Sequence, residues 1–326
     1  MGNQLKQQRG CASRYTYVFA ATQIFFAVIV AGLLAPCALA ETRIYCYQKV
    51  VDPGATGGGR VQIADFTIEV KPIADPDDPD NTLCGANVTA PNGKTVYSSR
   101  ASGAEIDLVT GKDVNGDGEP EAVLVTYSGG AHCCWTYHII SLGKKPGLIR
   151  EFENRDTASF EDLRGNGEVE IVIRDGTFDF GFGLDHATSV FPILVVQLRG
   201  SEFVDVSRDF WSTYEDEIQE AQENLSDGRI QEFLHRESTG DVYDLEHLRT
   251  KSSILLIVLD YLYGGKQDEA KKLLNKWWPK SSQEQTWSEI MTGYCSGVRA
   301  QLGIATDAGC TEKTASLHSL SAAEGH

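Results

Sequence analysis

The sequence lacks the short motifs that mark the common enzyme classes. It contains no Gly-x-Ser-x-Gly nucleophile turn, no phosphate-binding loop and no dinucleotide-binding glycine fingerprint. It is also poor in positive charge, with 29 Lys and Arg against 46 Asp and Glu, so the net charge is −17. An acidic surface repels phosphate backbones and anionic membranes. These absences argue against nucleic acid as a partner and against the familiar catalytic mechanisms.

The N-terminus differs in composition from the rest of the chain. No acidic residue precedes Glu41, three basic residues stand in the first 14 positions, and residues 18–34 are almost wholly apolar. Ala38 and Ala40 supply the small residues that a signal peptidase recognises. The pattern predicts a signal peptide over residues 1–40, a periplasmic or secreted protein, and no membrane contact after cleavage. The alternative is an inner-membrane anchor formed by an uncleaved N-terminal helix, because residues 18–39 are just long enough to span a bilayer.

Six cysteines lie beyond the predicted signal peptide, and an even count in an oxidising compartment predicts disulfides. They are Cys46, Cys84, Cys133, Cys134, Cys295 and Cys310. Proximity in the sequence favours the pairs Cys46–Cys84 and Cys295–Cys310. This leaves the adjacent Cys133 and Cys134.

The apolar pattern changes near residue 210. Before it, short apolar runs broken by Gly, Pro, Asn and Asp predict strands, which include residues 61–70, 122–127, 137–142, 169–173 and 191–198. After it, helical spacing predicts helices over residues 211–225, 245–263, 268–278 and 285–302. The expected fold is therefore α+β, with an antiparallel β-rich domain over residues 41–210, a helical domain over 211–310 and a disordered tail over 311–326.

An internal repeat lies within the β-rich region. Residues 113–121 and 162–170 resemble each other at a spacing of 49 residues, and each copy is followed by a predicted strand. About 50 residues is the length of a propeller blade. Residues 41–210 hold three such units at most, which is too few to close an ordinary propeller. We therefore expect a partial propeller or a small meandering sheet.

The first copy has the ligand spacing of a calcium loop. Asp113, Asn115 and Asp117 stand at positions 1, 3 and 5, the carbonyl of Glu119 can serve at position 7, and Glu121 stands at position 9. Calcium takes six to eight oxygen ligands from a chain that bends around it. These five residues are therefore the predicted Ca²⁺ ligands.

The second copy keeps the frame but changes the chemistry. Asp162 and Glu170 match the first and last acids of the loop, and Arg164 stands where a metal ligand belongs. A guanidinium beside carboxylates supplies the positive charge that a calcium ion would bring. We expect the second loop to fold without metal.

The calcium loop and the strand AVLV that follows it resemble the FG-GAP and VCBS repeat proteins over residues of about 105–200. In that family the fourth carboxylate stands at position 9 and the chain runs directly into a blade strand. The resemblance implies a propeller-type architecture and a role in adhesion or partner binding more often than catalysis. A weaker resemblance covers residues 254–274, whose apolar and small residues have the spacing of a tetratricopeptide helix pair.

The segment after the calcium-loop strand is the most unusual in composition. It contains His132, Cys133, Cys134 and Trp135. Three interpretations are open for it. The two cysteines form a disulfide with each other, or they pair with other cysteines, or they bind zinc or copper together with His132 and His186.

The corresponding segment of the second copy, residues 175–186, holds Asp179 and His186 among glycines and phenylalanines. Repeat symmetry predicts that it lies on the same side of the sheet as residues 128–135, where the two segments would bind a protein or small ligand of the cell envelope. The alternative for the phenylalanines is that they fill the core. The alternative functions are a metal-assisted envelope hydrolase that uses His132, His186 and Asp179, and a structural adaptor that acts through the helical domain.

Overall fold

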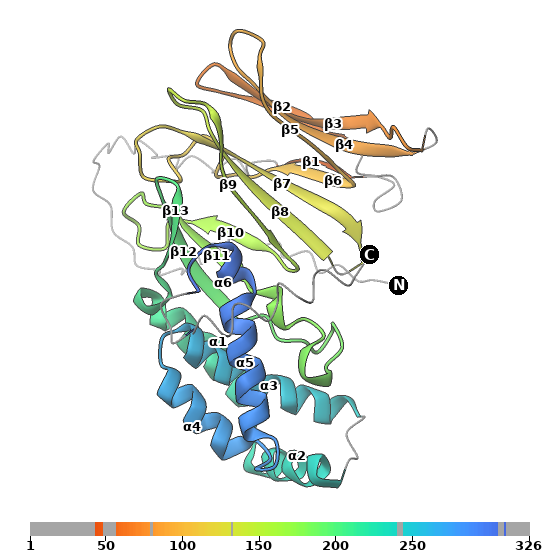
Figure 1. The fold of residues 1–326 in the computed structure, drawn as a ribbon, viewed down its shortest axis with the longest axis vertical. Coiled ribbons are helices and arrows are strands. Elements are labelled where there is room, and N and C mark those ends of the chain that lie inside the picture. Colours follow the sequence, from red (N-terminus) through yellow and green to blue (C-terminus); the bar gives the residue numbers. More distant parts are fainter. Residues whose placement is uncertain are drawn as a thin grey trace, which may run out of the picture. The chain divides into compact units, whose positions relative to one another are not determined.

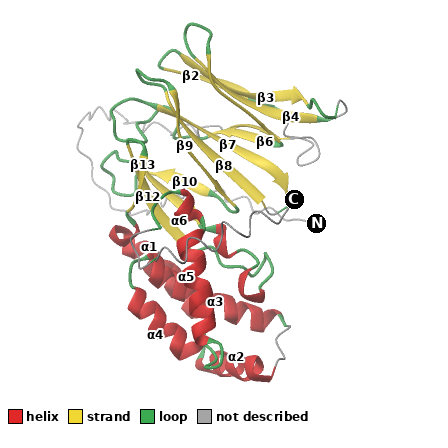
Figure 2. Cartoon of the chain, in the orientation of Figure 1, coloured by secondary structure: helices red, strands yellow, loops and turns green. Residues whose placement is uncertain are grey.

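The fold divides into strands in the N-terminal part and helices in the C-terminal part, as Figures 1 and 2 show. The structure, a computed structural model, describes residues 43–47, 57–78, 81–131, 133–239, 244–305 and 310. The predicted α+β class, with antiparallel sheets followed by helices, is confirmed. The predicted signal peptide, the tail after residue 310 and His132 lie outside the described residues.

The strands of the described residues form three antiparallel sheets. The N-terminal sheet has the order β2-β3-β4-β5, the middle sheet β1-β6-β7-β8-β9 and the C-terminal sheet β10-β11-β12-β13. Their bounds are β1 Ile44–Tyr47, β2 Gly59–Ile63, β3 Phe66–Ala74, β4 Thr82–Thr89, β5 Thr95–Ala101, β6 Gly103–Ile106, β7 Glu121–Gly130, β8 Cys133–Ser141, β9 Gly147–Asn154, β10 Ala158–Glu161, β11 Glu170–Arg174, β12 Ile193–Arg199 and β13 Glu202–Asp205.

The two copies of the repeat fold alike. Strands β6 to β9 and strands β10 to β13 each form a meander in which consecutive strands pair. In both meanders the acidic loop joins the first strand to the second. The single strand predicted over residues 61–70 is wrong, because a turn at Ala64 and Asp65 divides it into β2 and β3. Both turn residues have positive φ, 47° and 69°, a conformation that Asp tolerates better than most residues.

The middle sheet is buried on both faces. Along β7, Ala122 and Leu124 belong to a core shared with the N-terminal sheet, whereas Val123 and Val125 belong to a core shared with the C-terminal sheet. Successive side chains of a strand point to opposite faces, so each face of β7 meets a different sheet. This explains why its sequence reads as a continuous apolar run.

The helices of the described residues are α1 Trp211–Glu223, α2 Asp227–Thr239, α3 Leu245–Tyr263, α4 Gln267–Trp277, α5 Gln283–Ser296 and α6 Val298–Gln301. The sequence did not predict α2, which buries only Ile230 and Phe233 and so has a weak apolar stripe. The helix predicted over residues 285–302 is divided at Gly297. A Cβ at Gly297 would stand 1.9 Å from Oγ1 of Thr177, so only glycine permits this approach.

One apolar core joins the helices to the C-terminal sheet. Polar contacts reinforce it, since Tyr214 donates to the carbonyl of Ile193 at 2.9 Å and Tyr263 donates to Asp175 at 2.6 Å. The apolar stripes that suggested a tetratricopeptide pair are therefore used, at least in part, in packing against the sheet.

The disulfides Cys46–Cys84 and Cys295–Cys310 are confirmed. Such bonds persist in oxidising compartments, so the described part of the chain belongs outside the cytoplasm. Within that part, no helix is both long and apolar enough to cross a membrane.

Asp260 in α3 gives a pH-dependent prediction. It is fully buried, and neither carboxyl oxygen has a hydrogen-bond partner among the described residues. Burial, and after it the charge of Glu217, raises the pKa of Asp260 well above its usual value, while Arg174 opposes this. The folded protein therefore binds the proton more tightly than the unfolded chain, and stability falls as the pH rises above about 4.

We expect Asp260→Asn to be more stable than the wild type at pH 8 and to lose this advantage near pH 4. Because burial raises the pKa of Asp260, the stability gain of the variant should grow as the pH rises above about 4. Urea unfolding at several pH values measures it. A loss of stability at pH 8 would contradict the prediction.

Candidate functional site

The first acidic loop connects β6 to β7 and is closed by its own side chains. Asp113 accepts hydrogen bonds from the backbone N–H groups of Gly116 and Gly118 at 2.7 and 2.8 Å. Both glycines have positive φ, 75° and 86°, which permits the tight turn. Asn115 accepts from the N–H of Asp117 at 2.9 Å. The predicted ligands at positions 1, 3 and 5 thus lie on one short, folded loop.

Glu119 and Glu121 differ in their surroundings. The Glu119 side chain faces solvent and pairs with Lys144 at 3.3 Å. Glu121 begins β7 and is fully buried, and its Oε2 accepts from the N–H of Val114 at 2.7 Å. Its Oε1 is buried and has no hydrogen-bond partner within the described part of the chain.

Burial, with smaller effects of Asp117 and Asp113, raises the pKa of Glu121 to about 7. A buried carboxylate without a partner is costly. A cation bound between Glu121 and the loop acids would remove this cost.

The second acidic loop connects β10 to β11 and repeats the frame. Leu163 donates its N–H to Oε2 of Glu170 at 2.9 Å, as Val114 does to Glu121. Here, however, Oε1 of Glu170 accepts from Arg164 at 3.1 Å and from Gln197 at 2.8 Å. The expected guanidinium partner is therefore present.

The remaining contacts of the second loop refine that expectation. Arg164 also pairs with Asp209 at 2.8 Å. Asp162, which we expected beside the guanidinium, accepts backbone N–H groups from Asn166 and Gly167 at 3.0 and 2.9 Å. The arginine thus neutralises the buried acid at position 9, and the acid at position 1 closes the turn.

The two loops differ at two aligned positions that decide the environment of the buried acid. Arg164 corresponds to Asn115, and Gln197, the strand partner of Glu170, corresponds to Ser141, the partner of Glu121. The first loop therefore lacks both groups that satisfy the second. The acids of the first loop are not gathered tightly. Within the described residues, the His, Cys, Asp and Glu side chains whose ligand atoms all lie within 4.8 Å of one another are those of Cys133, Cys134 and Glu153, and no acid of the loop is among them.

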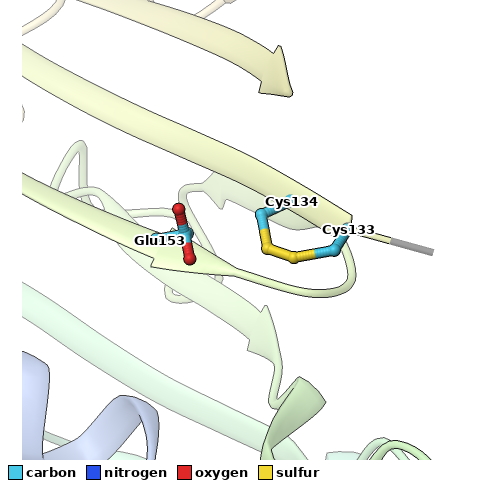
Figure 3. A group of neighbouring side chains, drawn as sticks. All are labelled: Cys133, Cys134 and Glu153. Atoms are coloured by element: carbon cyan, nitrogen blue, oxygen red, sulfur yellow. A yellow bond between two sulfur atoms is a disulfide. The ribbon is translucent and has the colours of Figure 1, made fainter. Parts of the chain in front are cut away.

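The β7–β8 hairpin carries the two adjacent cysteines. Figure 3 shows the sulfurs of Cys133 and Cys134 bonded to each other, with Glu153 of β9 beside them. Ser128 accepts from the N–H of Cys134 at 2.6 Å and donates to the carbonyl of Cys133, which closes the hairpin. Of the three interpretations, the structure thus has the disulfide between neighbours, and a zinc or copper site would need both thiols released.

Asp179 and His186 are brought together by the segment between β11 and β12. Nδ1 of His186 lies 2.9 Å from Oδ1 of Asp179, whose side chain is fully buried, and Arg155 lies 3.7 Å from Oδ2. The phenylalanines divide between the two expected roles. Phe178 is buried in the core, whereas Phe180 is 50% exposed and has a φ of 59°. A left-handed aromatic residue is uncommon, and such residues cluster at functional sites.

The two predicted segments meet in one hollow of about 250 Å³, which we call the hairpin pocket. Its lining residues are Tyr127, Ala131, Cys133, Trp135, Arg155, Asp156, His186 and Phe191. The expected placement on one side is therefore observed for Cys133, Trp135 and His186. Asp179 lies beneath His186 and does not line the pocket.

Arg155, Tyr127 and Phe191 were not among the predicted site residues. The sequence signal that could have found Arg155 is the run Asn154-Arg155-Asp156 between the two repeat units, where apolar residues give way to polar residues of opposite charge. The structure thus offers two candidate sites, the acidic loop and the hairpin pocket. No known family model, curated protein or solved structure matches this chain.

Proposed function

We propose that this chain is an exported binding protein of the cell envelope, stabilised by one calcium ion and carrying its ligand site in the hairpin pocket. The observation that carries the calcium assignment is the contrast between the two buried acids. Glu170 is satisfied by Arg164 and Gln197, whereas Oε1 of Glu121 has no such partner among the described residues. The FG-GAP and VCBS resemblance of the first loop supports the same assignment.

The calcium ion would be held by Asp113, Asn115, Asp117, Glu121 and the carbonyl of Glu119. Hard oxygen ligands of this kind suit calcium, and the ion would supply the positive charge that the loop lacks. Glu121 is the first residue of β7, whose side chains enter both apolar cores. Binding there would stabilise the middle sheet, on which the β7–β8 hairpin is built.

The lining of the hairpin pocket supports binding more than catalysis. Its sulfur, Cys133, belongs to a disulfide, and its remaining side chains are aromatic, charged or small. Aromatic residues and arginine dominate the energetics of most recognition sites, and loops on a rigid sheet are their usual position. The partner would be a protein or small ligand of the envelope.

Calcium titration of the chelator-treated mature protein tests this function. We expect calorimetry to find one tight calcium site per chain and a higher unfolding temperature with the ion bound. Asp113→Asn should abolish the heat of binding, while the matched substitution Asp162→Asn in the second loop should leave it unchanged. Absence of binding, or two equivalent sites, would contradict the assignment.

The Asp179–His186 hydrogen bond favours hydrolysis as a second candidate function. A carboxylate that orients a histidine is the arrangement of a general base. Chromogenic ester, phosphoester and glycoside substrates distinguish the two candidates. Turnover that is lost in His186→Gln, with the fold intact by circular dichroism, would favour the hydrolase, and equal background rates in both proteins would favour binding.

A further inference from the structure

A second hollow lies next to the hairpin pocket. This sheet pocket, of about 490 Å³, is lined mainly by β6, β8, β10 and β11, and Trp135 of β8 borders both hollows. The chain also passes directly from one to the other, since Arg155 and Asp156 line the hairpin pocket while residues 157–159 line the sheet pocket. The two hollows therefore adjoin at Trp135, and we call the two together the groove.

We infer that this groove binds a neutral oligosaccharide, an inference that rests on the proposed binding function and names its ligand class. Aromatic side chains line both parts of the groove. Tyr127 and Trp135 stand with ring centroids 4.6 Å apart in the hairpin pocket, and Tyr47 lines the sheet pocket. Aromatic rings offer flat apolar faces, which suit the C–H faces of successive sugar rings.

The charges of the groove select against a strongly charged ligand. Its arginines are Arg43, Arg155 and Arg174, and its acids are Glu105, Asp107, Asp156 and Glu161. With three guanidinium groups against four carboxyl groups, a polyanion and a polycation would each meet groups of like charge. A neutral ligand rich in hydroxyls can instead donate to the carboxylates and accept from the guanidinium groups.

The edge of strand β10 does not favour binding of an extended peptide. β10 pairs with β11 alone and so has a second edge toward the groove. An extended peptide would add there by backbone hydrogen bonds. However, the N–H of Ala158 donates to the Tyr137 hydroxyl at 2.6 Å, and that hydroxyl donates to the carbonyl of Ala158 at 3.3 Å. The backbone groups of Ala158, at the start of this edge, are therefore already occupied.

The centre of the groove is held in place before a ligand binds. Ser128 ties together the backbone of the disulfide-bonded hairpin that precedes Trp135. The backbone of Arg155 packs closely on Gly176, where an added Cβ would stand 2.6 Å from the Cβ of Arg155, and its guanidinium lies 3.7 Å from Asp179. Such preorganisation lowers the entropic cost of binding.

Tryptophan fluorescence titration of the calcium-loaded mature protein tests the inference. The probes are cellohexaose and chitohexaose as neutral glycans, hexagalacturonate as an acidic glycan, and an uncharged ten-residue peptide. We expect a neutral glycan to bind and Trp135→Ala to weaken it by at least about tenfold. Trp277→Ala, which removes a tryptophan of α4 outside the groove lining, should leave the dissociation constant unchanged when measured by calorimetry.

Any other outcome of the titration would overturn the assignment of a neutral oligosaccharide. These outcomes are failure of both neutral glycans to bind, tighter binding of hexagalacturonate, binding of the peptide in their place, or equal losses in the two tryptophan variants. None of them alters the calcium titration with Asp113→Asn and Asp162→Asn. Failure of the ligand assignment is therefore distinguishable from failure of the proposed function.

Discussion

Asn115→Arg should make the stability of the protein independent of calcium. Asn115 occupies the position that Arg164 holds in the second loop, where the guanidinium contacts Oε1 of the buried acid at 3.1 Å. An arginine at position 115 would reach Oε1 of Glu121 in the same way and replace the ion. At a calcium concentration about a thousand times the dissociation constant, the wild type should gain about 4 kcal/mol from the ion, and the variant should gain nothing.

The metal-free proteins should differ in their pH dependence. The folded-state pKa of Glu121, about 7, is above its usual 4.5, so the folded wild type holds a proton that the unfolded chain releases. Its free energy of unfolding should therefore fall as the pH rises from about 4.5 to 8, by about 3 kcal/mol. In Asn115→Arg the guanidinium favours the ionised carboxylate, and this loss should disappear.

Urea unfolding with calcium and with chelator, at pH 5 and pH 8, measures both effects. Asn115→Gln is the matched control, because it lengthens the side chain without adding charge and should not stabilise the metal-free protein. The converse variant, Arg164→Asn, should destabilise the second loop by about 3 kcal/mol, since it leaves Glu170 buried without its charged partner. A calcium response in Asn115→Arg equal to that of the wild type would refute the interpretation.

Features that depend on neighbours in the sequence could be predicted from the sequence. The pairs Cys46–Cys84 and Cys295–Cys310 join residues 38 and 15 positions apart, and the helix α3 follows its apolar spacing from end to end. The frame of the acidic loops was also readable, because each loop is closed by contacts within nine residues. All of these contacts join residues at most 38 positions apart.

Features that depend on the packing of distant segments could not be predicted. The hairpin pocket required the β9–β10 turn to bring Arg155 beside Asp179, and the sheet pocket required residues of β6, β8 and β10 to come together. The strand register places Ser141 opposite Glu121, whereas it places Gln197 opposite Glu170 in the second loop. The missing partner of Glu121 Oε1 follows from this register. A spacing rule identifies the ligands of a loop, but the need for an ion arises from burial, which is a property of the fold.

Arg299→Ala should be among the most destabilising substitutions in the helical part. Arg299 in α6 is 1% exposed, its Nη1 pairs with Asp205 of β13, and its Nη2 donates to the carbonyl of Ile304 at 3.1 Å. Its guanidinium also lies over the ring of Tyr294, 4.3 Å from the centroid. The residue thus connects the last helices to the C-terminal sheet, across 94 positions of sequence.

Truncating one partner of a buried ion pair costs about 3–5 kcal/mol, because the other charge stays buried without compensation. We expect this loss in Arg299→Ala, and a smaller one in the double variant Arg299→Met with Asp205→Leu, which removes both charges. Lys271→Ala breaks a surface pair with Glu284 at 3.5 Å and should cost less than about 1 kcal/mol. Equal losses in Arg299→Ala and the double variant would contradict this expectation, because only the single substitution leaves the Asp205 carboxylate without its guanidinium at the joint between helices and sheet.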